Sequence, residues 1–166
     1  MDPPFVIVMQ CGIILSGMVL VARRFAIPML VRHPLEDVLC LLCLIHTFRY
    51  AAFGAFALGI SAPVSSDALS LTGDLVSPAL AVIAAAMLHA RMPGAIQVAW
   101  VFNLVGLADL LVVFPGAVNA RVEGEALGLA WQILIFYTPA LLVTHVMMLR
   151  WLYKHAASRS RHSAFA

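Results

Sequence analysis

Five long apolar stretches constrain this chain more than any other feature of its sequence. They cover residues 4–22, 35–60, 72–91, 94–114 and 126–152, and only short connections and a tail remain. A helix needs roughly 20 apolar residues to cross the hydrocarbon core of a bilayer. With 63% hydrophobic residues, 11% charged residues and a mean hydropathy of +1.00, the chain is not an ordinary soluble domain.

The apolar stretches predict helices. Inside lipid, each segment must satisfy its own backbone hydrogen bonds, and a membrane barrel would instead show short alternating segments. We therefore predict an all-α integral membrane protein with a bundle of five transmembrane helices. The bundle forms one domain over residues 1–155, followed by a basic cytoplasmic tail at 156–166. Asp2 precedes the first stretch and Arg23 and Arg24 follow it, which is the reverse of signal-peptide polarity.

The basic residues predict the orientation. Eight of them fall on one side of the five stretches and one, Arg121, falls on the other. Since basic loops stay in the cytoplasm, the N-terminus is expected outside and the C-terminus inside, in the cell membrane (the inner membrane of a bacterium). The basic tail is expected to contact anionic lipid rather than nucleic acid. The eight residues are Arg23, Arg24, Arg32, Arg91, Arg150, Lys154, Arg159 and Arg161.

Turn-forming and acidic residues mark the expected helix ends. Glu36 and Asp37 stand in the first turn of the second stretch, where carboxylates suit the helix dipole. The sequence Met92-Pro93-Gly94 predicts a tight turn that makes the third and fourth helices antiparallel neighbours. Phe114-Pro115-Gly116 is expected to stop the fourth span, and Pro139 to kink or loosen the helix of the fifth.

Small residues recur at every fourth position in the second and third stretches. This spacing lets transmembrane backbones approach closely, so we expect these two helices to form a tight hairpin. Further small-residue faces favour a homo-oligomer. The two sets are Ala51, Ala55 and Gly59, and Ser77, Ala81 and Ala85.

A polar centre is expected in the middle of the bundle. Arg49 lies inside the second apolar stretch, where an arginine costs about 2.5–3.5 kcal/mol and requires a partner. At a rise of ~1.5 Å per residue, Arg49 and Asp109 lie ~21 and ~22 Å from the cytoplasmic end of their helices. His46, Asn103 and His145 lie lower, at ~16, ~13 and ~10 Å. These five residues are the predicted ligand-binding site.

Several chemical roles remain open for this centre. Arg49 and Asp109 form either a structural ion pair or an anchor for an anionic or proton-carrying ligand. His46 and His145 sit on different helices at similar depth, as the axial ligands of a haem b would. Alternatively, each histidine bonds to Asn103, Thr138, Thr144 or water. Cys40, Cys43 and His46 are poorly spaced for a metal ion, because successive i,i+3 steps drift around a helix.

Three sequence blocks resemble those of small bacterial multi-pass membrane proteins of unassigned function. This resemblance covers the second, fourth and fifth stretches and implies no particular activity. In size and span number the chain is also similar to translocator-protein and sterol-isomerase-like membrane proteins, although none of their residue patterns occurs. The blocks are His46-Thr47-Phe48-Arg49-Tyr50, Val101-Phe102-Asn103-Leu104-Val105-Gly106-Leu107-Ala108-Asp109-Leu110 and Pro139-Ala140-Leu141-Leu142-Val143-Thr144-His145.

These observations lead to three functional hypotheses. The first is a membrane protein whose polar site binds or translocates a small solute or protons. The second is a haem b electron-transfer protein with His46 and His145 as axial ligands. The third is an intramembrane enzyme that acts on a lipophilic substrate, with Asp109 or His46 as acid or base.

Overall fold

The computed structural model describes residues 3–50, 68–122 and 128–163. Within these ranges the chain is helical and contains no strand, which confirms the all-α class. The helices are α1 (Pro3–Val21), a π-helical turn η1 (Ala22–Ala26), α2 (Ile27–Leu30), α3 (Leu35–Thr47), α5 (Ala68–His89), α6 (Ala95–Val122) and α7 (Gly128–Ser163).

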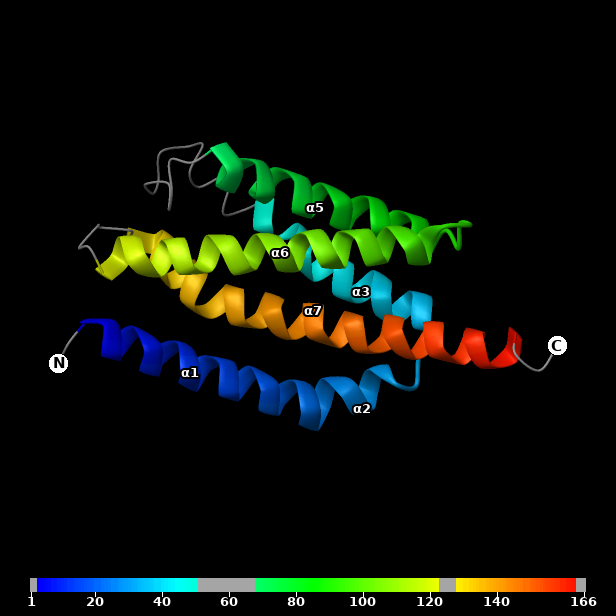
Figure 1. Cartoon of the computed structure of the whole chain (residues 1–166). Helices are drawn as coiled ribbons and strands as arrows, with labels where there is room; N and C mark the ends of the chain where they lie inside the picture. Colours follow the sequence, from blue (N-terminus) through cyan, green and yellow to red (C-terminus); the bar gives the residue numbers. More distant parts are fainter. Residues whose placement is uncertain (1–2, 51–67, 123–127, 164–166) are drawn as a thin grey trace.

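The helices lie side by side along one common direction (Figure 1). α5 packs between α3 and α6, and α7 contacts α3, α6 and α1. α1 contacts α7 and, to a smaller extent, α6. The two chain ends lie at opposite ends of the molecule (Figure 1).

Within the described ranges, three helices are long and apolar enough to cross a membrane. They are Phe5–Leu30, Ala95–Gly116 and Ile135–Ser158, and they coincide with the first, fourth and fifth predicted stretches. The shorter apolar helix Leu75–His89 falls in the third stretch. Of the second stretch, residues 51–60 lie outside the described residues. The structure therefore fits a helical membrane protein, while the count of five spans and their orientation stay predictions.

The first helical segment does not end at Arg23 and Arg24. The sequence predicted that Arg23 and Arg24 lie in a connection after residue 22, but both belong to η1, which joins α1 to α2. Pro28, near the start of α2, cannot donate a hydrogen bond to the carbonyl one turn earlier and crowds it. A π turn, in which the amide of Ile27 bonds to the carbonyl of Ala22, widens the helix there and lets it continue.

The turn between α5 and α6 forms where the sequence predicted it. Arg91 adopts a left-handed conformation with φ 53°, the amide of Met92 bonds to Met87 O at 2.9 Å, and that of Arg91 bonds to Leu88 O at 3.1 Å. This is the Schellman arrangement that closes a helix end. Gly94, with φ 85°, then redirects the chain into α6.

Proline does not end α6. α6 continues through Pro115 to Val122, whereas the candidate membrane span within it ends at Gly116, where the sequence predicted the fourth span to stop. Proline removes one backbone hydrogen bond. Breaking the remaining bonds of the helix would cost more free energy wherever water cannot replace them. α7 likewise continues through Pro139.

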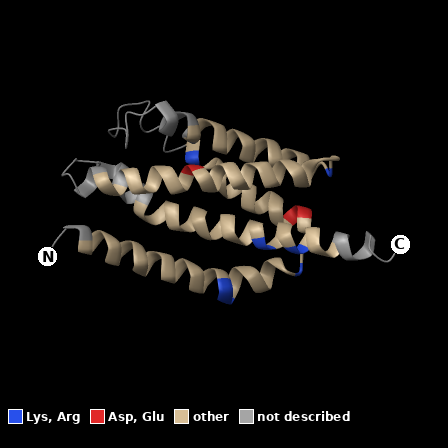
Figure 2. Cartoon of the chain, viewed as in Figure 1, with Lys and Arg blue, Asp and Glu red and all other residues tan. Residues whose placement is uncertain are grey.

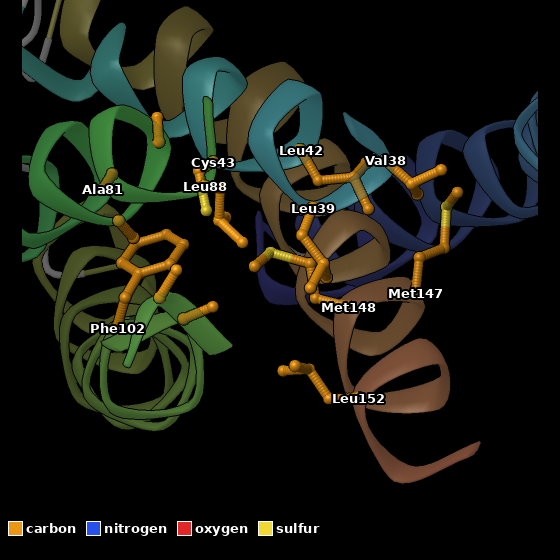
Figure 3. Close-up of a cluster of buried hydrophobic side chains, with 14 of the residues drawn as sticks. Val38, Leu39, Leu42, Cys43, Ala81, Leu88, Phe102, Met147, Met148 and Leu152 are labelled. Atoms are coloured by element: carbon orange, nitrogen blue, oxygen red, sulfur yellow. The ribbon is translucent and has the colours of Figure 1, made fainter. Parts of the chain in front are cut away.

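An apolar core packs next to the polar centre. It is formed mainly by α3, α5, α6 and α7 (Figure 3), with Ala22 of η1 and Leu30 of α2, and Phe102 belongs to both the core and the polar centre. Ser77, Ala81 and Ala85 are buried, as the predicted small-residue face of the third stretch requires. Cys40 Sγ lies 3.4 Å from Ala85 O, so α3 and α5 approach closely. The matching set at 51, 55 and 59 lies outside the described residues.

Candidate functional site

The end of α3 brings two site residues to the interior. α3 ends at Thr47, whose hydroxyl donates to Leu44 O at 2.7 Å, and the chain turns at Phe48 before it resumes helical geometry at Arg49. Phe48 is 69% exposed, whereas His46 is 0% and Arg49 is 4% exposed. The turn therefore directs His46 and Arg49 to the same interior region and Phe48 away from it.

Arg49 is bound by two neighbouring helices. Its Nη2 forms an ion pair with Asp109 Oδ2 of α6, and its Nη1 donates to Ser77 Oγ of α5 at 3.1 Å. Both partners of the ion pair are nearly buried. Figure 2 shows a segment coloured for Lys or Arg next to one coloured for Asp or Glu on neighbouring helices, away from the charges near the C-terminal end.

Two glycines create the space for these contacts. A Cβ at Gly73 of α5 would stand 1.8 Å from Asp109 Oδ1. A Cβ at Gly106 of α6 would stand 2.7 Å from His145 Cε1 and 2.9 Å from both His145 Nε2 and Ser77 Oγ. Gly106, which lies between Asn103 and Asp109 in the sequence, thus leaves room for the His145 ring and for Ser77.

The hydrogen bonds define the protonation of His46. Thr144 Oγ1 donates to Leu141 O at 2.8 Å and lies 2.9 Å from His46 Nε2. Since a hydroxyl has one hydrogen, Thr144 must accept at the second contact, so His46 carries its proton on Nε2. His46 Nδ1 is then a lone-pair acceptor. It is buried and has no hydrogen-bond partner among the described residues.

The same reasoning applies to His145. Its Nδ1 lies 2.8 Å from Asn103 Oδ1, and an amide oxygen only accepts, so His145 carries its proton on Nδ1. His145 Nε2 is therefore also a lone-pair acceptor. Neither this atom nor the amide nitrogen of Asn103 has a partner among the described residues. An unpaired buried polar group costs about 1–3 kcal/mol, so these three atoms are favourable positions for a hydrogen-bonding partner such as a proton, a water molecule or a small ligand.

The two imidazole rings are in direct contact. Their centroids are 4.1 Å apart with an angle of 50° between the planes, and Phe102 lies against both at 5.1 and 5.5 Å. An iron between two imidazoles would separate the ring centres by about 6 Å and place a macrocycle between them. The side chains as they lie do not fit a haem b, and we derive no chemistry from one.

The cysteines do not join the polar centre. Cys43 is buried in the apolar core and Cys40 contacts Ala85 O. Among the described residues, no group of three or more histidine, cysteine, aspartate or glutamate side chains is arranged to hold a metal ion.

Several residues contribute to the site in ways that the sequence did not predict. Ser77 was expected only as a packing residue, yet it bonds to Arg49, and Gly73 was not singled out. Tyr137 donates to Ile45 O at 2.6 Å, which satisfies a carbonyl in the last turn of α3. A usable signal existed for Ser77 and Gly73, because a four-residue spacing places both on one face of α5.

All five predicted site residues therefore meet at the junction of α3, α5, α6 and α7. The fold and this centre define a class: a helical protein with candidate membrane spans and a buried polar cluster. A family model described as "Domain of unknown function (DUF8737)" matches residues 6–153, and the chain belongs to that family. No curated protein and no solved structure matches the chain.

Proposed function

We propose that this protein is a multi-pass membrane protein whose polar centre binds and relays protons. The proposal includes five spans in the cell membrane, with the N-terminus outside and the C-terminus in the cytoplasm. One observation carries the proton assignment. Two buried imidazoles in contact each have a lone-pair nitrogen, and neither nitrogen has a hydrogen-bond partner among the described residues.

A proton suits this centre better than a larger solute. His46, His145, Asn103 and Phe102 are fully buried and pack directly on one another. A proton needs no cavity, and imidazole is the side chain whose unperturbed pKa of ~6.5 suits proton exchange. A proton arriving at either lone pair would be held next to a second acceptor.

Ser77 provides the link between the histidines and the ion pair. Ser77 Oγ accepts from Arg49, and both Ser77 Oγ and His145 Nε2 lie 2.9 Å from the position that a Cβ on Gly106 would take. Among the side chains that the structure describes, the charged groups near the imidazoles are Arg49, which disfavours a bound proton, and Asp109, which favours one. Because these two are paired, they add no net charge to the centre. Opening of the pair would change the proton affinity of the histidines, which is how the site would be gated.

Proton flux into liposomes tests the proposal. Wild-type protein is reconstituted with an enclosed pH-sensitive dye, and a potassium gradient with valinomycin supplies the driving force. We expect flux above that of empty vesicles, and a loss of at least tenfold in His46→Ala, Arg49→Ala and Asp109→Asn. His89→Gln is the matched control, since His89 is an exposed histidine at the other end of α5.

Two results would reject the proposal. One is a wild-type flux equal to that of empty vesicles. The other is wild-type flux in all three site variants, provided that they remain folded by circular dichroism and gel filtration in detergent.

A further inference from the structure

A groove runs between α1 and α7, apart from the polar centre. Its wider part has a volume of about 310 Å³ and is lined by α1, η1, α2 and α7. A second cavity of about 190 Å³, lined by α1, α6 and α7, shares Leu15 and Leu142 with the first. The two cavities therefore adjoin along the same pair of helices. Nearly all of the lining side chains are apolar.

Two arginines stand at the wider part of this groove. Arg23 of η1 and Arg150 of α7 both line it, and both side chains are solvent-accessible in the isolated chain. Neither has an ion-pair partner among the described residues. Like charges brought to one cavity from two helices repel each other, so an anion between them would be stabilised.

The π turn at η1 separates two neighbouring arginines. Arg23 lines the groove, while the guanidinium of Arg24 lies over the ring of Phe25 at 5.6 Å from its centroid. Two residues with the same charge, in the same turn, thus face different surroundings. Arg24 is therefore a matched control for Arg23.

The groove combines an apolar channel with a cationic end. The candidate membrane span Phe5–Leu30, which contains α1, is only 11% buried, so most of this helix is not covered by other parts of the protein. A ligand that fills the groove must be apolar over most of its length and anionic at one end. Basic sites between membrane helices on the cytoplasmic side bind the headgroups of anionic lipids.

We propose that this groove holds one anionic phospholipid. Its phosphate lies between Arg23 and Arg150, and one acyl chain extends along Leu15 and Leu142 toward the second cavity. The bound lipid fills the space between α1 and α7, which also contact each other directly. This site is distinct from the basic tail, and the proposal does not depend on the proton relay.

The test measures lipid binding to purified protein in mild detergent. Phosphatidylglycerol and phosphatidylcholine with identical acyl chains are compared by native mass spectrometry and by thermal unfolding. We expect phosphatidylglycerol to bind more tightly and to raise the melting temperature more. The variant R23Q/R150Q should bind it roughly 30-fold more weakly, since each basic residue near anionic lipid contributes about fivefold.

Two further variants separate a seated lipid from general attraction to negative charge. R24Q removes the same charge from the same turn and should bind like wild type. Val19→Trp fills the groove while it keeps both arginines, and should reduce binding of phosphatidylglycerol. Equal binding of both lipids, an equal loss in R24Q, or full binding in R23Q/R150Q would each overturn the proposal. Should the double variant fail to fold, R23Q and R150Q are compared singly with R24Q.

Discussion

At the scale of single residues, the polar centre is governed by how its charge is compensated. Arg49 is buried between α5 and α6 and has a carboxylate and a hydroxyl as partners. The bare cost of a buried charge is several kcal/mol, and it is offset only when the partner is well placed. Gly73 permits that placement because it leaves the space that Asp109 occupies. The ion pair therefore depends on a glycine that carries no charge itself.

We predict that Asp109→Asn destabilises the protein by about 3 kcal/mol, because Arg49 would remain buried without its counter-charge. Arg49→Gln should be destabilising for the same reason. The double variant Asp109→Asn/Arg49→Gln should recover part of this loss, since two neutral amides can bond to each other. Denaturant unfolding of the four proteins in detergent gives the coupling free energy. Strictly additive losses would contradict the pairing.

We also predict that Gly106→Ala destabilises the protein by about 1–3 kcal/mol, because the new Cβ would meet the His145 ring and Ser77 Oγ at less than 3 Å. Gly17→Ala is the control. A Cβ there has nothing within 4 Å, and alanine is favoured over glycine in a helix by about 0.5–1 kcal/mol. Thermal unfolding in detergent compares the two variants. A melting temperature of Gly106→Ala at or above that of wild type would show that the site is not tightly packed.

At the scale of helices, the structure shows how far hydropathy determines the elements. The apolar stretches at residues 4–22, 94–114 and 126–152 all became long helices. The first helix continues through Arg23 and Arg24, and α6 continues through Pro115, because a helix keeps its backbone bonds wherever breaking them would leave polar groups without a partner. Counting residues along the helices placed Arg49 level with Asp109. Counting does not give the rotation of each helix, and so Ser77 and the hydrogen-bonding state of His46 needed the structure.

The turn between α5 and α6 carries the prediction that belongs to this scale. Arg91 occupies a left-handed position that usually takes glycine, and its side chain pairs with Glu36 and Asp37 at the start of α3. Arg91→Ala and Arg91→Gly both lose these exposed pairs, but only glycine relieves the backbone. We therefore expect Arg91→Gly to be more stable than Arg91→Ala by about 1 kcal/mol, measured by thermal unfolding. Equal stability of the two variants would mean that the left-handed turn is not strained.

At the scale of the whole molecule, the direction of insertion decides which end of the groove and of the polar centre faces which compartment. The two termini lie at opposite ends of the bundle (Figure 1). Arg32, Arg91 and Arg150 belong to the connections and helix end that the sequence places in the cytoplasm. With that orientation, the lipid groove opens its cationic end to the cytoplasmic leaflet, and Asp109 lies on the outer side of the histidines.

Single cysteines in a variant without Cys11, Cys40 and Cys43 test this orientation in intact cells. A cysteine replacing Ser163, at the end of α7, should react with a membrane-impermeant maleimide only after the cells are permeabilised. A cysteine replacing Gly94, in the turn between α5 and α6, should behave in the same way, whereas one replacing Asp2 should react in intact cells. The charge bias predicts this result because translocating basic connections against the membrane potential is unfavourable. Labelling of Ser163→Cys and Asp2→Cys from the same side would require an even number of crossings, and labelling of Gly94→Cys in intact cells would reverse the orientation.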